Sequence, residues 1–388
     1  MTGLAIKMPA LRLQAADTLL CAALVALLIA GFVAMSSASI EFARTQYDNP
    51  FHHIQRHGFY LVLALIGGIA VFHVPTAALD RHGWWLLLLG VALLCLVLIV
   101  GREVNGSKRW LAVGPFTVQV SEFVKLFVII YMAGYLVRRR DEVRSNLAGF
   151  LKPLVVMAIL IVLLLAEPDF GAAVVIMGAV MGMLFLGGAR LWQFMTLTAV
   201  ALVAAGAMVA TSDYRMERLL AYTNPWEHQY GISYQLVQAL IAFGRGEWFG
   251  VGLGNSVQKL SYLPEAHTDF VFAILAEEMG AVGVLVVLAL FATLVGRMLQ
   301  VARRAERHGF CFGAYLSYGA ALLIALQVFI NVGVNTGLLP TKGLTLPFFS
   351  YGGSSLITCV VLVALVARVE LTVREQQVTA EQEVQAGQ

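Results

Sequence analysis

Long apolar stretches, separated by shorter polar connections, occupy most of the chain. A helix needs about 17 to 25 residues to cross the roughly 30 Å of hydrocarbon in a bilayer. The stretches of this kind are residues 19–36, 58–74, 84–100, 118–137, 150–166, 170–189, 191–210, 270–296, 310–336 and 346–367. The sequence lacks the short alternating segments typical of a membrane β-barrel. The pattern therefore predicts an all-α integral membrane protein with ten transmembrane helices.

Composition supports the same class of protein. Of the 388 residues, 60% are hydrophobic and 13% are charged, whereas a soluble domain has roughly a quarter charged residues. All four cysteines lie in or beside apolar stretches without metal-type spacing, so neither a disulfide framework nor a zinc site is indicated. The formal net charge of +3 gives no indication of nucleic-acid binding.

Lysine and arginine set the predicted orientation, because short loops rich in them remain in the cytoplasm. Fifteen lie in the termini and even-numbered connections, against six on the other side once the long connection 211–269 is left out. Both termini are therefore predicted to be cytoplasmic, and 211–269 to be a long periplasmic loop between the seventh and eighth helices. We expect a cytoplasmic segment at 1–18, a membrane domain at 19–370, and a disordered cytoplasmic tail at 371–388, which is rich in Gln and Glu.

The densest group of polar side chains, residues 255–269, directly precedes the eighth apolar stretch. Its last residue, Asp269, is predicted to lie where a membrane helix meets periplasmic water, beside the first unpaired amide groups of that helix. Such a carboxylate can act as a base, but an aspartate ahead of an apolar helix is more often an N-cap. Taken alone, the position favours capping over catalysis.

Charged residues also occur within two of the apolar stretches. Glu122 and Lys125 lie three residues apart on one face of the fourth predicted helix, and Glu277 and Glu278 lie in the eighth. A charge near mid-bilayer costs roughly 2.5 to 3.5 kcal/mol even on a lenient scale, so these side chains are expected to face the bundle or a wet cavity. For Glu122 and Lys125, a structural ion pair and a functional role fit the spacing equally well.

Three outer segments add candidate groups. Lys108 and Arg109 follow a turn close to the membrane surface, and the short turn 167–169 lets Asp169 cap the next helix. Between 335 and 355, prolines and glycines interrupt an apolar region whose only cation is Lys342. Irregular backbone at membrane depth is tolerated only where protein or a cavity covers it, which indicates a site.

Several motifs occur in the same order as in one known family. They are Asn105-Gly-Ser-Lys-Arg-Trp110, Ser121-Glu-x-x-Lys125, Pro168-Asp169-x-Gly171, Tyr234-Gln-x-x-Gln238, Gly252-Leu-Gly-Asn-Ser256, Leu263-Pro-Glu-Ala-His-Thr-Asp-Phe270 and Ser350-Tyr-Gly-Gly-Ser-Ser355. Together they resemble the SEDS proteins (shape, elongation, division and sporulation), which are membrane-embedded peptidoglycan polymerases of bacteria. The sequence of residues 340–347, Pro-Thr-Lys-Gly-Leu-Thr-Leu-Pro, resembles that of the division branch of the family rather than that of the elongation branch. One departure is Val120, where the family usually has a proline.

The resemblance implies that Asp269 is essential for polymerisation, which changes its interpretation from cap to general base. Joining two lipid-linked disaccharides requires a sugar hydroxyl to lose its proton as it attacks an anomeric carbon bearing pyrophosphate, and the family's reaction inverts that carbon. The departing pyrophosphate needs positive charge, which we expect first from Lys125 and Arg109, paired through the fold with Asp169. The further candidate substrate-binding residues are Glu122, Lys259, Glu265, His267, Lys342 and Ser350, with Glu265 as the second-choice base.

The expected function is therefore that of a peptidoglycan glycosyltransferase polymerising lipid II at the periplasmic face of the inner membrane, at the division septum. The resemblance implies a class B penicillin-binding protein, the division transpeptidase, as partner, together with other division proteins. No cofactor is indicated for certain, and the sequence leaves open a divalent cation, Mg²⁺ or Mn²⁺, at the pyrophosphate. The alternative is a lipid II flippase, motivated by the acidic and basic residues within spans. A scaffold without activity would leave the clustered outer charges unexplained.

Overall fold

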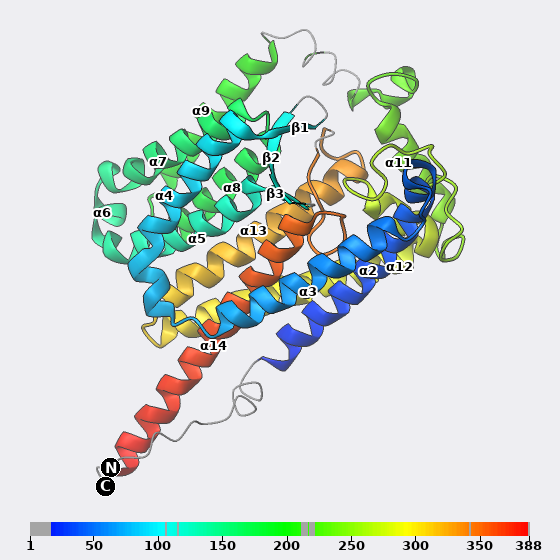
Figure 1. Cartoon of the computed structure of the whole chain (residues 1–388). Coiled ribbons are helices and arrows are strands. Elements are labelled where there is room, and N and C mark those ends of the chain that lie inside the picture. The colour runs from blue at the N-terminus through cyan, green and yellow to red at the C-terminus, as the bar shows by residue number, and fades with distance from the viewer. Residues whose placement is uncertain are drawn as a thin grey trace.

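The protein is a bundle of long helices with one small sheet (Figure 1). The computed structural model describes residues 17–104, 107–114, 116–210, 216, 222–340 and 343–386. The helices are α2 (Thr18–Tyr47), α3 (His52–Phe72), α4 (Thr76–Val100), α5 (Val120–Arg138), α6 (Arg140–Ser145), α7 (Leu147–Ala166), α8 (Phe170–Leu186), α9 (Leu191–Ala210), η1 (Pro225–His228), α11 (Tyr234–Gly246), α12 (Val271–Arg307), α13 (Cys311–Asn335) and α14 (Gly353–Ala386).

Eight helices of the described chain are long and apolar enough to cross a membrane: α2, α3, α4, α5, α7, α12, α13 and α14. Two further apolar helices, α8 and the Leu191–Val200 part of α9, are shorter. Each expected span overlaps one of these ten helices, so a mostly helical membrane protein is confirmed. The count of ten spans and the cytoplasmic orientation of the termini stay predictions.

The helices differ in how much apolar surface they bury. In α5, α13 and α14 most residues are enclosed by other elements, whereas α3 and α4 leave most of their apolar side chains exposed. A helix that is apolar all round lies either inside a protein or against lipid. We therefore interpret α5, α13 and α14 as the centre of the bundle and α3 and α4 as lipid-facing.

A three-stranded antiparallel sheet, which the sequence did not predict, connects α4 to α5. Its strands β1 (Arg102–Val104), β2 (Ser107–Val113) and β3 (Phe116–Gln119) follow the order of the chain, and Trp110 pairs with Gln119. The expected fourth span at 118–137 therefore starts two residues later, at Val120, because residues 118 and 119 belong to β3. The sheet places Arg109 beside the turn before α8, at Pro168, and Gln119 beside the start of α14, at Ser354.

Helix α12 is broken at Gly280, whose φ of 65° and ψ of −169° are not helical. The carbonyls of Glu277 and Glu278, freed by the break, accept hydrogen bonds from the amides of Val251 and Gly252 at 3.0 Å each. A Cβ on residue 280 would lie 2.4 Å from the backbone nitrogen of Gly250, so only glycine fits. The loop after α11 thus replaces the missing helical hydrogen bonds of α12.

The last helix is longer than the sequence suggested. We expected a disordered tail at 371–388, but α14 remains helical as far as Ala386 and extends beyond the bundle (Figure 1). The Gln, Glu and Ala of this segment have high helix propensity, and the buried part of α14 supplies the first turns.

Candidate active site

Two buried asparagines of α13 hold the backbone of Asp269. The carbonyl of Asp269 accepts a hydrogen bond from Asn331 Nδ2 and another from Asn335 Nδ2, both at 3.0 Å. Asn331 Nδ2 also donates to the carbonyl of Leu344 at 2.6 Å, and Asn335 Oδ1 accepts from the amide of Ala273 at 3.2 Å. The start of α12, the end of α13 and the irregular 343–352 segment are thereby locked together around Asp269.

The carboxyl of Asp269 does not cap its own helix. The N-cap position of α12 is Phe270, and no side-chain capping hydrogen bond is formed there. Within the described chain no hydrogen bond to either carboxyl oxygen of Asp269 is found, so the capping interpretation is wrong. A Cβ on Gly343 would lie 2.9 Å from Asp269 Oδ2, so the glycine leaves space directly beside the carboxyl.

The ionisation of Asp269 is shifted toward neutral pH. Burial raises the pKa of Asp269 from its ordinary value of 3.8 to about 7; repulsion from Glu265 adds to the rise and the positive charge of Arg109 opposes it. A carboxylate with this pKa is a stronger base than an ordinary aspartate and is still largely ionised slightly above neutral pH.

Asp169 is fully engaged at the start of α8. Its Oδ1 accepts a hydrogen bond from the amide of Ala172 at 3.1 Å, which is the predicted cap. Its Oδ2 accepts from Ser121 Oγ at 2.7 Å and from Gln119 Nε2 at 3.3 Å. The side chain thus ties α8 to the junction between β3 and α5.

Arg109 reaches from β2 to the turn between α7 and α8. Its Nε donates to the carbonyl of Glu167 at 3.2 Å and its Nη2 to the carbonyl of Pro168 at 2.6 Å. We expected Arg109 and Lys125 to pair with Asp169, but neither forms an ion pair with it in the part of the chain that the structure describes. The expected pairing is wrong because main-chain carbonyls of the turn hold the guanidinium instead, which leaves its positive charge unneutralised.

Glu167 is fully buried. From the sequence it was predicted only to be part of the turn before α8. Neither of its carboxyl oxygens has a hydrogen-bond partner among the described residues. Burial raises the pKa of Glu167 from 4.5 to about 8; Asp169 adds to the rise and Arg109 opposes it. The carboxyl is therefore protonated at neutral pH. The indication in the sequence was a pair of carboxylates two residues apart in a turn too short to separate them.

Glu122 and Lys125 form a buried ion pair on α5, with 2.7 Å between Lys125 Nζ and Glu122 Oε1. Glu122 Oε2 has no hydrogen-bond partner in the described part of the chain, and no second hydrogen bond from Lys125 is found there. The pair follows directly after Ser121, whose hydroxyl binds Asp169. The pair thus begins one residue after a direct contact of Asp169, and Glu122 Oε2 has spare hydrogen-bonding capacity.

Three other candidates lie on the segments around Asp269. Glu265 is exposed, and its Oε2 accepts a hydrogen bond from Thr268 Oγ1 at 2.6 Å. His267 is buried against Phe42, with ring centroids 4.6 Å apart, and burial lowers its pKa to about 4, so the ring is neutral. Ser350 Oγ accepts from the amide of Leu346 at 2.7 Å and closes a turn of the irregular segment. Lys342 lies outside the described residues, as do Arg215 and Arg218 of the long loop.

Lys259 belongs to a separate polar cluster at the break in α12. Its Nζ donates to Glu278 Oε1 at 2.8 Å and to Ser37 Oγ at 2.9 Å, and Ser37 Oγ in turn donates to Glu278 at 2.6 Å. The neighbouring Glu277 accepts hydrogen bonds from Ser256 Oγ, the amides of residues 257 and 258, and Arg245. The cluster fastens the loop that leads to Asp269 onto α12 and α2.

The described residues contain no group of three or more His, Cys, Asp or Glu side chains arranged to hold a metal ion. Histidines do gather near the site, where His53 and His267 lie with ring centroids 4.9 Å apart, but they stack as rings.

Comparison with known proteins identifies the family. Residues 17–375 match the family described as cell cycle protein, which groups FtsW, RodA and SpoVE. The chain belongs to this family. Relatives named probable peptidoglycan glycosyltransferase FtsW come from Nitrosococcus halophilus, 53% identical over 92% of this chain and 93% of the relative, and from Pseudomonas fluorescens, 52% identical over 91% and 88%.

Solved structures agree with this family assignment. The rod shape determining protein RodA of Thermus thermophilus is 28% identical, with a TM-score of 0.68 over 92% of this chain and 96% of RodA. A chain of a peptidoglycan synthase complex that coordinates polymerization and crosslinking gives a TM-score of 0.77 at 28% identity, over 92% and 97%. The SEDS resemblance and the expected enzyme class, a peptidoglycan glycosyltransferase of cell division, are confirmed.

Proposed function

We propose that this FtsW-family chain joins lipid II molecules into glycan strands at the periplasmic face of the inner membrane, with Asp269 as the general base. The single observation that supports this best is the state of the Asp269 carboxyl. Its backbone carbonyl is held by two asparagines of α13, while its carboxyl oxygens receive no hydrogen bond from the described residues. A group held in position and left unpartnered is available to a substrate.

The chemistry requires a base on one side and positive charge on the other. The acceptor hydroxyl gives its proton to Asp269 as its oxygen bonds to the anomeric carbon of the donor, and the bond from that carbon to the pyrophosphate breaks. The leaving pyrophosphate gains negative charge, which Arg109 and Lys125 stabilise without donating a proton. Inversion follows from attack on the face opposite the leaving group.

The neutral state of Glu167 has a consequence for Arg109. An ionised Glu167 would attract the guanidinium, whereas the protonated carboxyl leaves it bound to neutral partners, two main-chain carbonyls and the Ser107 hydroxyl. The full positive charge of Arg109 is then free to interact with a diphosphate. Glu265, exposed and four residues from Asp269, remains the second candidate for the base.

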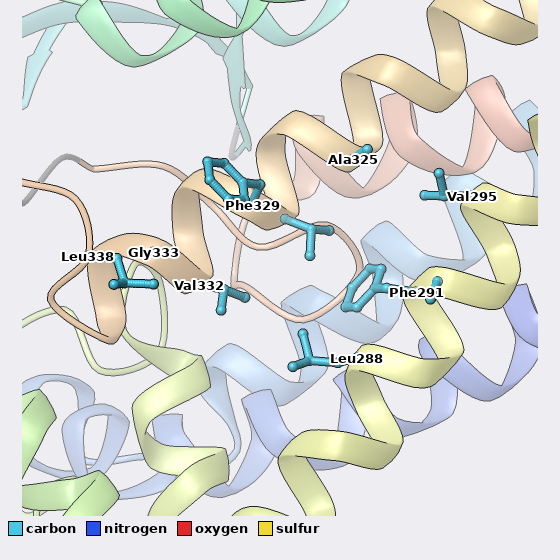
Figure 2. Close-up of a pocket in the computed structure, with 10 residues that line it drawn as sticks. Leu288, Phe291, Val295, Ala325, Phe329, Val332, Gly333 and Leu338 are labelled. Atoms are coloured by element: carbon cyan, nitrogen blue, oxygen red, sulfur yellow. The ribbon is translucent and has the colours of Figure 1, made fainter.

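A groove between α12 and α13 supports the proposal of a membrane partner, the class B penicillin-binding protein. The groove has a volume of about 350 Å³ and apolar walls that include Leu288, Phe291 and Phe329 (Figure 2). One end reaches Gly333, two residues from Asn335, which holds Asp269. A single partner helix packed here by shape would contact the same helix that positions the base.

The flippase alternative loses much of its basis. It was motivated by acidic residues within spans, but Glu277 accepts hydrogen bonds from the loop after α11, and Glu278 accepts them from Lys259 and Ser37. Only Glu122 and Lys125 retain spare hydrogen-bonding capacity, and they adjoin the Asp169 turn.

The test is reconstitution of the purified chain in liposomes with fluorescent lipid II, with and without the partner and with EDTA. We expect glycan strands, formed faster with the partner, and a lower rate in EDTA if a divalent cation binds with the pyrophosphate. A Phe329→Trp variant, which fills the groove, should lose the partner's stimulation and keep the basal rate. Lipid II that crosses the bilayer without being joined, equally well with Asp269→Asn, would contradict the proposal and favour a flippase.

A further inference from the structure

A polar cavity lies at the opposite end of the bundle from Asp269, between α4, α5 and α7. It has a volume of about 830 Å³. These three helices lie side by side at one side of the molecule (Figure 1). The cavity is formed by the first turns of α4 and α7 and the last turns of α5, at the end that the charge distribution predicts to be cytoplasmic. We call it the α4/α5/α7 pocket.

The rim of the α4/α5/α7 pocket is positively charged. Its lining cations are Arg81, Arg138, Arg139 and Lys152, and its lining acid is Asp80. Arg138 pairs with Asp80 at 2.7 Å, while Arg139 and Lys152 share the nearby Glu142. Four cations against these two carboxylates leave a net charge of +2.

These ion pairs are exposed, with 48% to 53% of the basic side chains accessible. Exposed pairs between long side chains are weak, because water solvates both charges and holding the chains in place costs entropy. The cations can therefore exchange their carboxylate partners for a phosphate, which accepts charge-assisted hydrogen bonds from several donors at once.

On each of the three helices, the residues that line the pocket change from charged to apolar or aromatic within one or two turns. On α4, Trp84 lies one turn from Asp80; on α7, Val156 lies one turn from Lys152. On α5, the buried Tyr131 lies two turns before Arg138, with its ring centroid 5.8 Å from that of Trp84. Tryptophan and tyrosine favour the depth of lipid headgroups. A ligand that fits this gradient has an anionic head and an apolar body.

We propose that the α4/α5/α7 pocket binds an anionic phospholipid, with its phosphate between Arg139 and Lys152 and the first carbons of its acyl chains against Trp84 and Val156. Basic pockets between membrane helices on the cytoplasmic side bind the headgroups of such lipids. This site is separate from the Asp269 region and does not depend on the proposed glycosyltransferase mechanism. A lipid bound here would pack against α5 and stabilise its position, and the other end of α5 carries Glu122 and Lys125.

The experiment titrates delipidated, full-length protein with phosphatidylglycerol and with phosphatidylcholine, and measures retained lipid by native mass spectrometry together with the midpoint of thermal unfolding. We expect one phosphatidylglycerol to be retained and to raise the midpoint. Lys152→Gln and Arg139→Gln should each weaken this binding by about fivefold, since a cation near the membrane surface contributes about 1 kcal/mol. Both side chains are exposed, so neither change should prevent folding.

Arg307→Gln is the matched control, because Arg307 is an exposed arginine at the basic end of α12, outside the pocket. It should leave phosphatidylglycerol binding unchanged. The proposal is overturned if phosphatidylcholine binds equally well, or if the pocket variants behave like Arg307→Gln. Inorganic phosphate provides the last arm: if it alone reproduces the stabilisation and displaces the lipid, the pocket is a site for free phosphate.

Discussion

This protein contains two buried lysine–glutamate ion pairs. Their charged atoms are about equally far apart, but the two pairs differ in the hydrogen bonds that surround them. Lys125 and Glu122 are 2.7 Å apart, and Lys259 and Glu278 are 2.8 Å apart. All four side chains are at most 9% exposed. Around Lys259, Ser37 binds both partners of the pair. Around Lys125, one carboxyl oxygen of Glu122 has no partner among the described residues.

The difference separates a structural pair from a functional one. Removing two charges from water costs several kcal/mol each, and the pair repays this only when further hydrogen bonds satisfy the remaining donors and acceptors. Lys259 and Glu278 meet that condition and fasten the loop before Asp269 to α12 and α2. Glu122 and Lys125 do not, and we propose that the phosphate of a substrate supplies the missing hydrogen bonds.

Of the two pairs, Glu122 and Lys125 are expected to have the larger effect on turnover. Lys125→Met should lower the rate of lipid II polymerisation roughly 10²–10³-fold, because it removes positive charge from the leaving pyrophosphate in a site of low dielectric. The double variant Glu122→Gln, Lys125→Met avoids a lone buried charge, so it should fold normally and remain inactive. If the double variant polymerises lipid II as fast as the unchanged protein, the Glu122–Lys125 pair has only a structural role.

The structural pair should respond in stability and not in turnover. Lys259→Met leaves Glu278 buried without its cation, which costs about 3–5 kcal/mol of stability. The measurement is the midpoint of thermal inactivation, with activity expressed per folded molecule. Adding Glu278→Gln should restore most of the lost stability. A Lys259→Met protein that melts normally but has lost its activity per molecule would show that the pair acts on the substrate.

Glu167 predicts a pH dependence of stability. Its pKa is about 8 in the folded protein and 4.5 when exposed, so the folded state retains a proton that the unfolded chain releases. The stability that this proton contributes is complete below pH 4.5 and is lost as pH rises through about 8. Glu167→Gln should therefore flatten the decline of the thermal midpoint between pH 4.5 and about 8. An unchanged decline would mean that Glu167 is ionised in the folded protein.

The smallest effect is expected from the asparagines behind Asp269. Asn335→Ala removes one of two hydrogen bonds to the carbonyl of Asp269 while Asn331 keeps the other, so kcat should fall by about tenfold through looser positioning of the base. Thr336→Ala, which removes only hydrogen bonds within the end of α13, is the matched control. Equal losses from both variants would indicate general loosening of α13.

The sequence predicted the positions of the helices well, because an apolar run of sufficient length needs no knowledge of distant residues. It did not predict the sheet between α4 and α5, the break at Gly280 or the partner of Lys259. Each of these depends on approach between distant segments: Ser37 and Glu278, which bind one another, are 241 residues apart. Such pairings cannot be found from local periodicity.

The sequence predicted which residues belong to the candidate site better than it predicted the contacts between them. Asp169 does cap α8, and Glu122 does pair with Lys125, since both relations are local in sequence. The family resemblance favoured a base over a cap for Asp269, and the structure adds that its carboxyl makes no cap to its own helix. Glu167 was missed because its partnerless burial depends on β2 and Arg109 covering the turn.

The most direct measurement is the rate at which Asp269→Asn polymerises lipid II, compared with the unchanged protein across pH 5 to 9. The account predicts that the unchanged protein gains about tenfold in rate per pH unit up to about pH 7 and then levels off, as the carboxyl ionises. Asp269→Asn should be slower by about 10²–10⁴-fold and should lose this dependence. An Asp269→Asn protein that forms glycan strands at the normal rate, with the same pH profile, would contradict the assignment of the base.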